Sequence, residues 1–149
     1  MTHWRDRFTV VPAVYIVLRK EGKILVLKRA NTGYRDGSYS LPGGHIDGHE
    51  SATQAAIREA EEEIGVSIDE KDLHLVYTQH CVGEGDYHER INLFFSADKW
   101  AGSPVNAEPN KSSEIRWSSL DDMPEEMVPE LGDFIKSLKT GEPFGYYGF

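Results

Sequence analysis

The sequence predicts an α/β fold in which a mixed sheet lies between helices. Two observations predict it: apolar segments of strand length stand on both sides of an amphipathic helical segment, and a second segment with helical spacing lies near the end of the chain. The chain has 149 residues, of which 39% are hydrophobic. We therefore expect one domain over residues 1–149 with a core of ordinary size.

The first third of the chain is predicted to be a β-hairpin followed by loops and a short strand. The expected order is strand 10–18, turn 19–23, strand 24–27, loop 31–37 and strand 38–41. Pro42-Gly43-Gly44 and Gly48 then predict a tight, irregular loop. Such a loop lets backbone groups approach an ion or a phosphate closely.

A helix with a cluster of carboxylates is predicted next, from the N-cap at Ser51 to a left-handed C-cap at Gly65. At 100° per residue, one arc of about 140° holds all the charged residues of the cluster. These residues are Arg58, Glu59, Glu62 and Glu63. Like charges at this spacing destabilise a helix unless positive charge lies over them. Arg58 supplies part of that charge, and a divalent cation with oxygen ligands is the leading source of the rest.

The remaining elements are strands, a long loop and a final helix. The expected order is extended chain 66–68, strand 73–82, turn 83–86, strand 88–97, loop 100–111, strand 115–117 and helix 128–138. The strands 73–82 and 88–97 form a hairpin. The aromatic tail 143–149 is expected to be flexible. It packs either on the domain or on a second subunit, so a homodimer is one possibility.

Composition excludes several classes of protein. The net charge of -9 without a basic stripe argues against nucleic acid as a partner. No apolar run is long enough for a membrane span, and residues 1–7 lack the apolar region of a signal peptide. With Cys81 as the single cysteine, no internal disulfide can form. We therefore expect a cytoplasmic protein without a membrane partner.

Seven fixed residues around the helix follow one spacing pattern. They are Gly44, Glu50, Arg58, Glu59, Glu62, Glu63 and Gly65, with apolar Val66 after them. This pattern resembles the signature of the Nudix hydrolases, and Leu41-Pro42-Gly43 and the segment around Trp117 also look like that family. The resemblance implies an α/β/α sandwich. It also implies an enzyme that uses Mg²⁺, or Mn²⁺, to hydrolyse a pyrophosphate bond in a small nucleotide.

The resemblance also implies roles for the residues of the signature. Glu59 and Glu63 would be the principal metal ligands, Glu62 a further ligand or the group that orients the water, and the Gly43 carbonyl a possible backbone ligand. Arg58 would orient these carboxylates with support from Glu50. A further glutamate often completes the site or acts as the base in this family. Glu114, close to Trp117, and Glu108 are the two candidates, and either is equally a surface carboxylate.

Substrate-binding candidates precede the helix. Arg29 matches a position that contacts nucleotide in some members of the family, and its alternative is a solvated surface arginine. Tyr34, Arg35 and Tyr39 are suited to stacking on a base or meeting a phosphate, and the aromatic rings are equally suited to packing a loop. The chain lacks the marks of relatives specialised for ADP-ribose, NADH or dinucleoside polyphosphates. Nucleoside triphosphates, including modified ones, are therefore the leading substrate class, followed by nucleotide sugars.

Two other functions remain as alternatives. A non-catalytic nucleotide-binding sensor on the same fold would be expected to have lost some glutamates of the signature, whereas this chain keeps them all. An enzyme acting on RNA ends would be expected to have a basic groove, which the charge balance disfavours.

Overall fold

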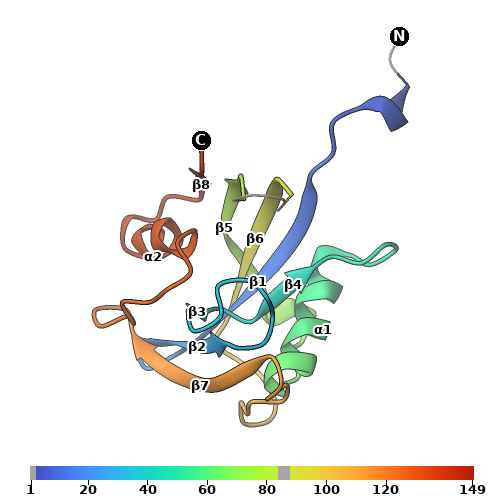
Figure 1. The fold of residues 1–149 in the computed structure, drawn as a ribbon. Helices are drawn as coiled ribbons and strands as arrows, with labels where there is room; N and C mark the ends of the chain where they lie inside the picture. The colour runs from blue at the N-terminus through green and yellow to red at the C-terminus, as the bar shows by residue number, and fades with distance from the viewer. Residues whose placement is uncertain (1–2, 84–87) are drawn as a thin grey trace.

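The computed structural model describes residues 3–83 and 88–149. In this part of the chain an eight-stranded sheet lies between two α-helices (Figure 1). The strands are β1 (Val11–Lys20), β2 (Lys23–Arg29), β3 (Tyr39–Ser40), β4 (Gly43–His45), β5 (His74–Cys81), β6 (Arg90–Ala97), β7 (Ser112–Ser119) and β8 (Phe144–Tyr147). The helices are α1 (Ala52–Ile64), α2 (Leu131–Thr140) and the short 3-10 helices η1 (Trp4–Asp6) and η2 (Glu70–Asp72).

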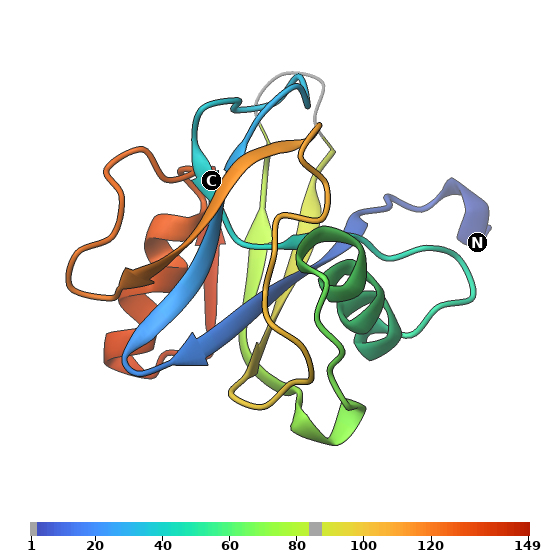
Figure 2. The same cartoon turned by 90° about the horizontal axis from the view of Figure 1, so that it is seen from below.

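The sheet is mixed, as the sequence predicts. Its main path runs β3-β2-β1-β6-β5-β8, while β4 pairs with β1 and β7 pairs with β2. The pairs β1–β6 and β5–β8 are parallel, and the other pairs are antiparallel. Figure 2 shows α1 and α2 on opposite sides of the strands. The expected α/β/α arrangement is therefore confirmed.

Two apolar clusters hold the helices to the sheet. Alternate residues of β1 point to opposite faces, so Val14, Ile16 and Leu18 pack with α1 while Val17 packs with α2. The α1 cluster includes Ala55, Ala56, Ala60, Ile64, Leu25 and Phe95, and the α2 cluster includes Ile24, Val26, Phe94, Leu131 and Phe134. Small alanines on α1 let this helix lie close to the strands.

Strand β1 changes its antiparallel partner along its length. Its first half, Ala13–Tyr15, pairs with β4, whereas Arg19–Lys20 at its end pair with β2. The sheet therefore splits where β4 and β2 diverge from β1. This split positions the site, because the glycine-rich segment before α1 lies on one side of it and β2 on the other.

The segment 42–44 differs from the expectation of an irregular loop. Gly43 and Gly44 belong to β4 and pair with Tyr15 and Val14. A Cβ at Gly43 would lie 2.2 Å from the Val14 carbonyl oxygen. These glycines therefore allow close approach of two backbones within a ladder, which the composition alone does not separate from a turn.

The C-terminal region also differs from expectation. The tail forms β8, which pairs with β5 and gives this segment regular structure. Helix α2 begins at Leu131, three residues later than predicted, because a turn precedes it in which Leu131 N–H donates to the Val128 carbonyl. Of the predicted turn 83–86, residues 84–86 lie outside the described residues. No helix in the described ranges is long and apolar enough to cross a membrane.

Both ends of α1 are formed by the predicted capping residues. The Ser51 hydroxyl accepts from Gln54 N–H, and the Gln54 side chain accepts from Ser51 N–H, which completes a capping box. At the other end, Gly65 has φ +68° and its N–H donates to the carbonyls of Ala60 and Glu61. The carboxylates of the last two turns thus lie on a helix with fixed ends.

Two glycine-to-alanine variants test this description through opposite effects on stability. Gly65→Ala is expected to lower the free energy of unfolding by about 1 kcal/mol, because alanine is strained at positive φ. Gly132→Ala in α2 has open space around the new Cβ and is expected to raise stability by up to about 1 kcal/mol. Thermal unfolding followed by circular dichroism measures both. Equal changes in stability for the two variants would contradict the placement of Gly65 at a left-handed C-cap and of Gly132 inside a helix.

Candidate functional site

The carboxylates of α1 do not share one environment. Glu59 is 9% exposed and faces β4, Glu63 is partly buried, and the side chain of Glu62 is 52% exposed. Glu63 and Glu59 lie close enough for each to affect the pKa of the other. The helix therefore buries two of its acidic groups together and leaves the third at the rim.

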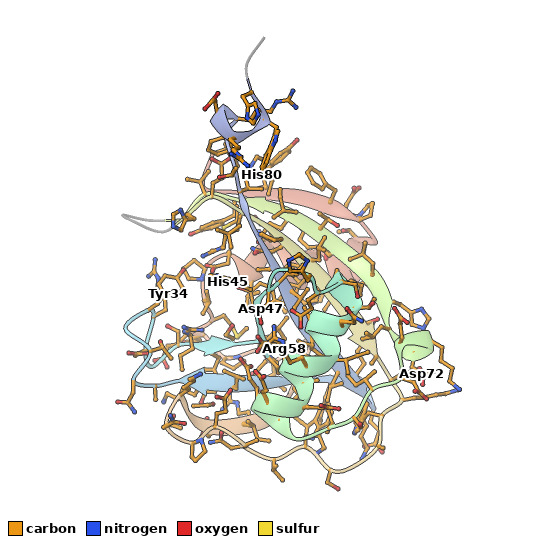
Figure 3. All side chains as sticks on the ribbon, turned by 90° about the vertical axis from the view of Figure 1, so that its right-hand side faces the viewer. Tyr34, His45, Asp47, Arg58, Asp72 and His80 are labelled. Carbon is orange, nitrogen blue, oxygen red and sulfur yellow. The ribbon has the colours of Figure 1, made fainter. Side chains whose placement is uncertain are left out.

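Arg58 joins the segment before α1 to these carboxylates. Its guanidinium donates two hydrogen bonds to the Glu50 carboxylate, from Nε at 2.7 Å and from Nη2 at 3.0 Å. Its Nη1 donates to Glu59 Oε1 at 2.9 Å and to Glu62 Oε2 at 3.2 Å. Figure 3 shows Arg58 on α1 with His45 and Asp47 of the preceding segment near it, and Nη2 also donates to the His45 carbonyl. One cation thus fixes the positions of three glutamates.

Strand β4 lies directly against the two buried carboxylates. Gly43 N–H donates to Glu63 Oε2 at 3.1 Å. A Cβ at Gly44 would lie 2.3 Å from Glu59 Oε1 and 2.6 Å from its carboxyl carbon. Gly44 therefore leaves the space that the Glu59 carboxylate occupies.

Burial raises the pKa values of both glutamates, and a neighbouring carboxylate adds to each shift, Glu62 for Glu59 and Glu59 for Glu63. Burial is the largest cause for each, and it raises the pKa of Glu63 to about 8, with the nearby Glu59 charge as the second cause. The pKa of Glu59 is also raised by burial, while Arg58 opposes the shift. Conversely, the hydrogen bonds from Arg58 hold the pKa of Glu50 below its usual value. With a pKa of about 8, Glu63 therefore retains its proton at neutral pH in the metal-free protein.

The donor chemistry of this pair suits a hard divalent cation. Carboxylate oxygens are the ligands that Mg²⁺ and Mn²⁺ prefer, and a cation between the two carboxylates would replace the proton of Glu63. Across residues 3–83 and 88–149, however, no three Asp, Glu, His or Cys side chains converge as a ready metal site. Glu62 is turned to Arg58 instead of toward Glu63.

The structure distinguishes the two candidates for a further glutamate. Glu108 lines the same pocket as Glu63, its charge raises the pKa of Glu63, and its carboxylate pairs with Lys111 at 3.2 Å. Glu114 accepts a hydrogen bond from the Tyr39 hydroxyl. Its neighbours Ile115 and Trp117 pack on the α1 face, so Glu114 points to the opposite face. The structure thus brings Glu108, and not Glu114, to the carboxylates.

A pocket of about 610 Å³ opens at the split in the sheet. At one end are Gly43, Gly44, Glu63, Glu108 and Lys111. It is also lined by residues of β1, β2 and the loop 31–37, among them Ala13, Val14, Tyr15, Leu27, Arg29, Tyr34, Leu41 and Arg90. This volume lies within the usual range for small-molecule sites.

The four predicted substrate-binding residues separate into two groups. Arg29 and Tyr34 line the pocket, with the Arg29 guanidinium 5.3 Å from the centre of the Tyr34 ring and its Nε donating to the Tyr34 carbonyl. Tyr39 is buried on the other face, where Arg116 lies 4.6 Å from its ring centre. Neither Tyr39 nor Arg35 is among the described residues that line the pocket.

The site residues predicted from the sequence omit several polar residues of the pocket, among them Lys111, Tyr15 and Arg90. The sequence places Lys111 in a loop, Tyr15 in a buried strand and Arg90 near the start of a strand. A buried arginine among apolar strand residues was the available signal for Arg90. Nothing local in the sequence marked Lys111 or Tyr15, because strand pairing and loop packing bring them to the pocket.

Replacing Glu63 with glutamine is expected to stabilise the metal-free protein at alkaline pH. The folded-state pKa of about 8 exceeds the unfolded value near 4.5. The stability due to the bound proton is therefore full below about pH 4.5, and is lost as the pH rises to about 8. Glu63→Gln should raise the melting temperature in EDTA at pH 8.5 by roughly 2–8 °C, with a much smaller effect at pH 5.

Glu61→Gln is the matched control. Glu61 lies on the same helix and is exposed, with a hydrogen bond from the Ser67 hydroxyl at 3.3 Å. It should change the melting temperature by less than about 2 °C at both pH values. A Glu63→Gln effect that did not depend on pH would show that Glu63 holds no extra proton in the folded state.

Comparison with known proteins relates this geometry to a family. The chain is 35% identical over 96 residues to a protein named putative 8-oxo-dGTP diphosphatase 3 from Mycobacterium tuberculosis. The aligned region covers 63% of this chain and 43% of that relative. It is also 27% identical over 139 residues to the NAD-capped RNA hydrolase NudC of Salmonella typhi. This aligned region covers 92% of this chain and 50% of that relative. The chain thus spans about half the length of these two relatives.

The fold has close counterparts among solved structures. The MutT NUDIX hydrolase of Burkholderia pseudomallei superposes with a TM-score of 0.78 at 24% identity, over 85% of this chain and 95% of that one. A family model described as NUDIX domain matches residues 9–138, which include the carboxylate helix and the pocket-lining strands. The chain therefore belongs to the Nudix family, as the residues from Gly44 to Val66 predict.

Proposed function

We propose that this protein is a divalent-metal-dependent hydrolase that cleaves a pyrophosphate bond in a nucleoside triphosphate or another nucleoside diphosphate derivative. The observation that carries the proposal is the pair formed by buried Glu59 and partly buried Glu63, of which Glu63 lines a pocket of ligand size. Family membership supports the hydrolase class. The relatives' names include a diphosphatase of a modified nucleotide and a hydrolase of capped RNA. Small nucleotides are our proposal among such substrates.

Glu59 and Glu63 would hold Mg²⁺ or Mn²⁺, with Glu62 or the Gly43 carbonyl completing the site after Arg58 and β4 adjust. The metal would neutralise the charge of the pyrophosphate group, which otherwise repels an attacking water. Arg58 keeps Glu59 oriented and is itself fixed by Glu50. Because a supporting partner of this kind contributes strongly to metal affinity, we assign Arg58 and Glu50 a positioning role.

The loop residues Glu108 and Lys111 would act on the phosphate side of the pocket. Lys111 lies in the field of Glu59 and Glu63 and is available to phosphate oxygens once it leaves Glu108. Glu108 then remains as a carboxylate beside Glu63 that can accept a proton from the attacking water. We propose Glu108 for this role in place of Glu114, because Glu114 lies on the other face of the sheet. Glu62 at the rim is the second candidate.

The first test is hydrolysis of a substrate panel. Nucleoside triphosphates, nucleotide sugars and ADP-ribose are incubated with Mg²⁺ or Mn²⁺, and release of phosphate or pyrophosphate is measured. Turnover of at least one class is expected, with a loss of roughly 10²–10³-fold for Glu63→Gln. Glu61→Gln should retain the rate of the unchanged protein. Nucleotide binding without hydrolysis under any condition would favour the sensor alternative instead.

Gly44→Ala tests the space reserved for Glu59. The new Cβ would displace the Glu59 carboxylate, which we expect to weaken Mn²⁺ binding by roughly 10–100-fold. Since a flexible side chain can move aside, the melting temperature should change little. Gly48→Ala is the control, because its Cβ would meet no atom within 4 Å. Calorimetric titration with Mn²⁺ measures both, and equal affinities would contradict the role of Gly44.

A further inference from the structure

The large apolar side chains that the fold leaves exposed are gathered mainly in two segments. Across residues 3–83 and 88–149, seven such side chains are exposed, and the five aromatic ones all lie in residues 3–10 or 144–149. They are Trp4 (65% exposed), Phe8 (74%), Phe144 (46%), Tyr146 (60%) and Phe149 (73%). Single exposed apolar residues are ordinary, whereas a contiguous group of exposed rings marks an interaction site.

Residues 3–10 form an arm that leaves the body of the domain. The 3-10 helix η1 lies within this arm, and Figures 1 and 2 both show the arm projecting outward from the start of β1. Every residue from His3 to Thr9 is exposed. The two rings of the arm, Trp4 and Phe8, therefore have no cover on their own domain.

The other three rings, Phe144, Tyr146 and Phe149, lie together on the α1 side of the sheet. Leu93 of β6 packs with the α1 cluster and pairs with Thr78, which in turn pairs with Phe144. Paired residues share a face of a sheet, so Phe144 and Tyr146, two residues later, point to the α1 side. The Tyr146 ring contacts Phe144 and Phe149 edge-on, with 5.1 and 5.8 Å between the ring centres. We call these three rings the aromatic face.

The arm and the surroundings of the aromatic face carry opposite charge. The arm has Arg5 and Arg7 against the single carboxylate of Asp6, although the chain as a whole has a net charge of -9. Beside the face, the His80 ring lies 4.7 Å from Phe149 and 2.6 Å from the Glu89 carboxylate, measured between Nε2 and Oε1. A basic arm is therefore complementary to the acidic border of the aromatic face.

The backbone beside the aromatic face is also suited to receive an extended segment. Strand β8 ends the main path of the sheet, with no further described strand beyond it. An outer strand of this kind is a natural place for another chain to bind. The arm is extended where η1 ends, since Arg7 has φ -80° and ψ 150°. The arm thus has the backbone shape that fits along β8.

We propose that the protein forms a homodimer in which the arm of each protomer packs on the aromatic face of its partner. A second copy of this chain is the fitting occupant, because the arm and the face are complementary and the arm points away from its own domain. Each exposed ring contributes on the order of 100 Å². Five rings from each protomer then bury about 1,000 Å², which reaches the size of a specific interface. A two-fold exchange of arms covers every one of these rings and closes the assembly at two chains.

Sedimentation equilibrium of the full chain tests the assembly directly. At protein concentrations up to about 100 μM, we expect the mass of two chains, twice 16.8 kDa. A mass of one chain throughout this range would overturn the proposal. A mass above that of two chains would also overturn it, because a reciprocal exchange of arms is closed.

Two double variants remove the rings on either side of the contact. Trp4→Ala with Phe8→Ala alters the arm, and Tyr146→Ala with Phe149→Ala alters the aromatic face. Each should weaken dimerisation by at least about 100-fold, because a symmetric dimer then loses both of its arm contacts. Val105→Ala is the control, since Val105 is 52% exposed but belongs to neither group. A dimer that only the face variant weakens is a face-to-face dimer and would contradict the role of the arm.

Mixing the two double variants identifies the exchange of arms. In a mixed dimer, the intact arm of the face variant meets the intact face of the arm variant, so one of the two contacts is restored. The mixture should therefore dimerise at least about tenfold more tightly than either variant alone. No gain on mixing would show that the arm does not bind the partner's aromatic face. Thermal unfolding of each variant checks that the compared proteins are folded.

Discussion

The contact of Arg58 with Glu50, Glu59 and Glu62 is the interaction on which the site depends. Without it, the carboxylates of α1 would repel one another and have no fixed positions. The same guanidinium ties the segment before the helix to the helix itself through the His45 carbonyl. Electrostatic compensation and loop geometry are therefore parts of a single arrangement. The fixed ends of α1 and its alanine-rich inner face then hold that arrangement against the sheet.

The site lies where the sheet is least regular. Because β1 pairs first with β4 and later with β2, the two parts of the sheet separate beside Tyr15 and leave room for a pocket. Part of this pocket is lined by the carboxylates of Glu63 and Glu108, whose negative charge the nearby cations only partly balance. Arg90, which is paired with Glu130, and the rings of Tyr15 and Tyr34 also line it. A nucleotide has the complementary distribution, with a highly charged phosphate part and a flat base. This complementarity supports a nucleotide as the ligand of the pocket.

Stability and function oppose each other in this protein. Burying Glu59 beside Glu63 raises the pKa values of both and makes the folded state bind a proton that the unfolded chain releases. Natural sequences keep such costly groups where they serve a site. The buried Nε of Arg90, which has no hydrogen-bond partner among the described residues, is a second cost of the same kind. Both costs occur in one pocket, while the two apolar clusters supply the stability of the domain.

The sequence by itself determined the family, the α/β/α arrangement, the ends of α1 and the group of charged residues on one helix face. These features follow from local spacing, which periodicity and capping make visible. Only the tertiary structure decided that Gly43 and Gly44 form a strand, that Glu108 and not Glu114 lies beside Glu63, and that Arg90 reaches the pocket. Those facts depend on strand pairing and on which face a strand residue takes, and residues distant in the sequence set both.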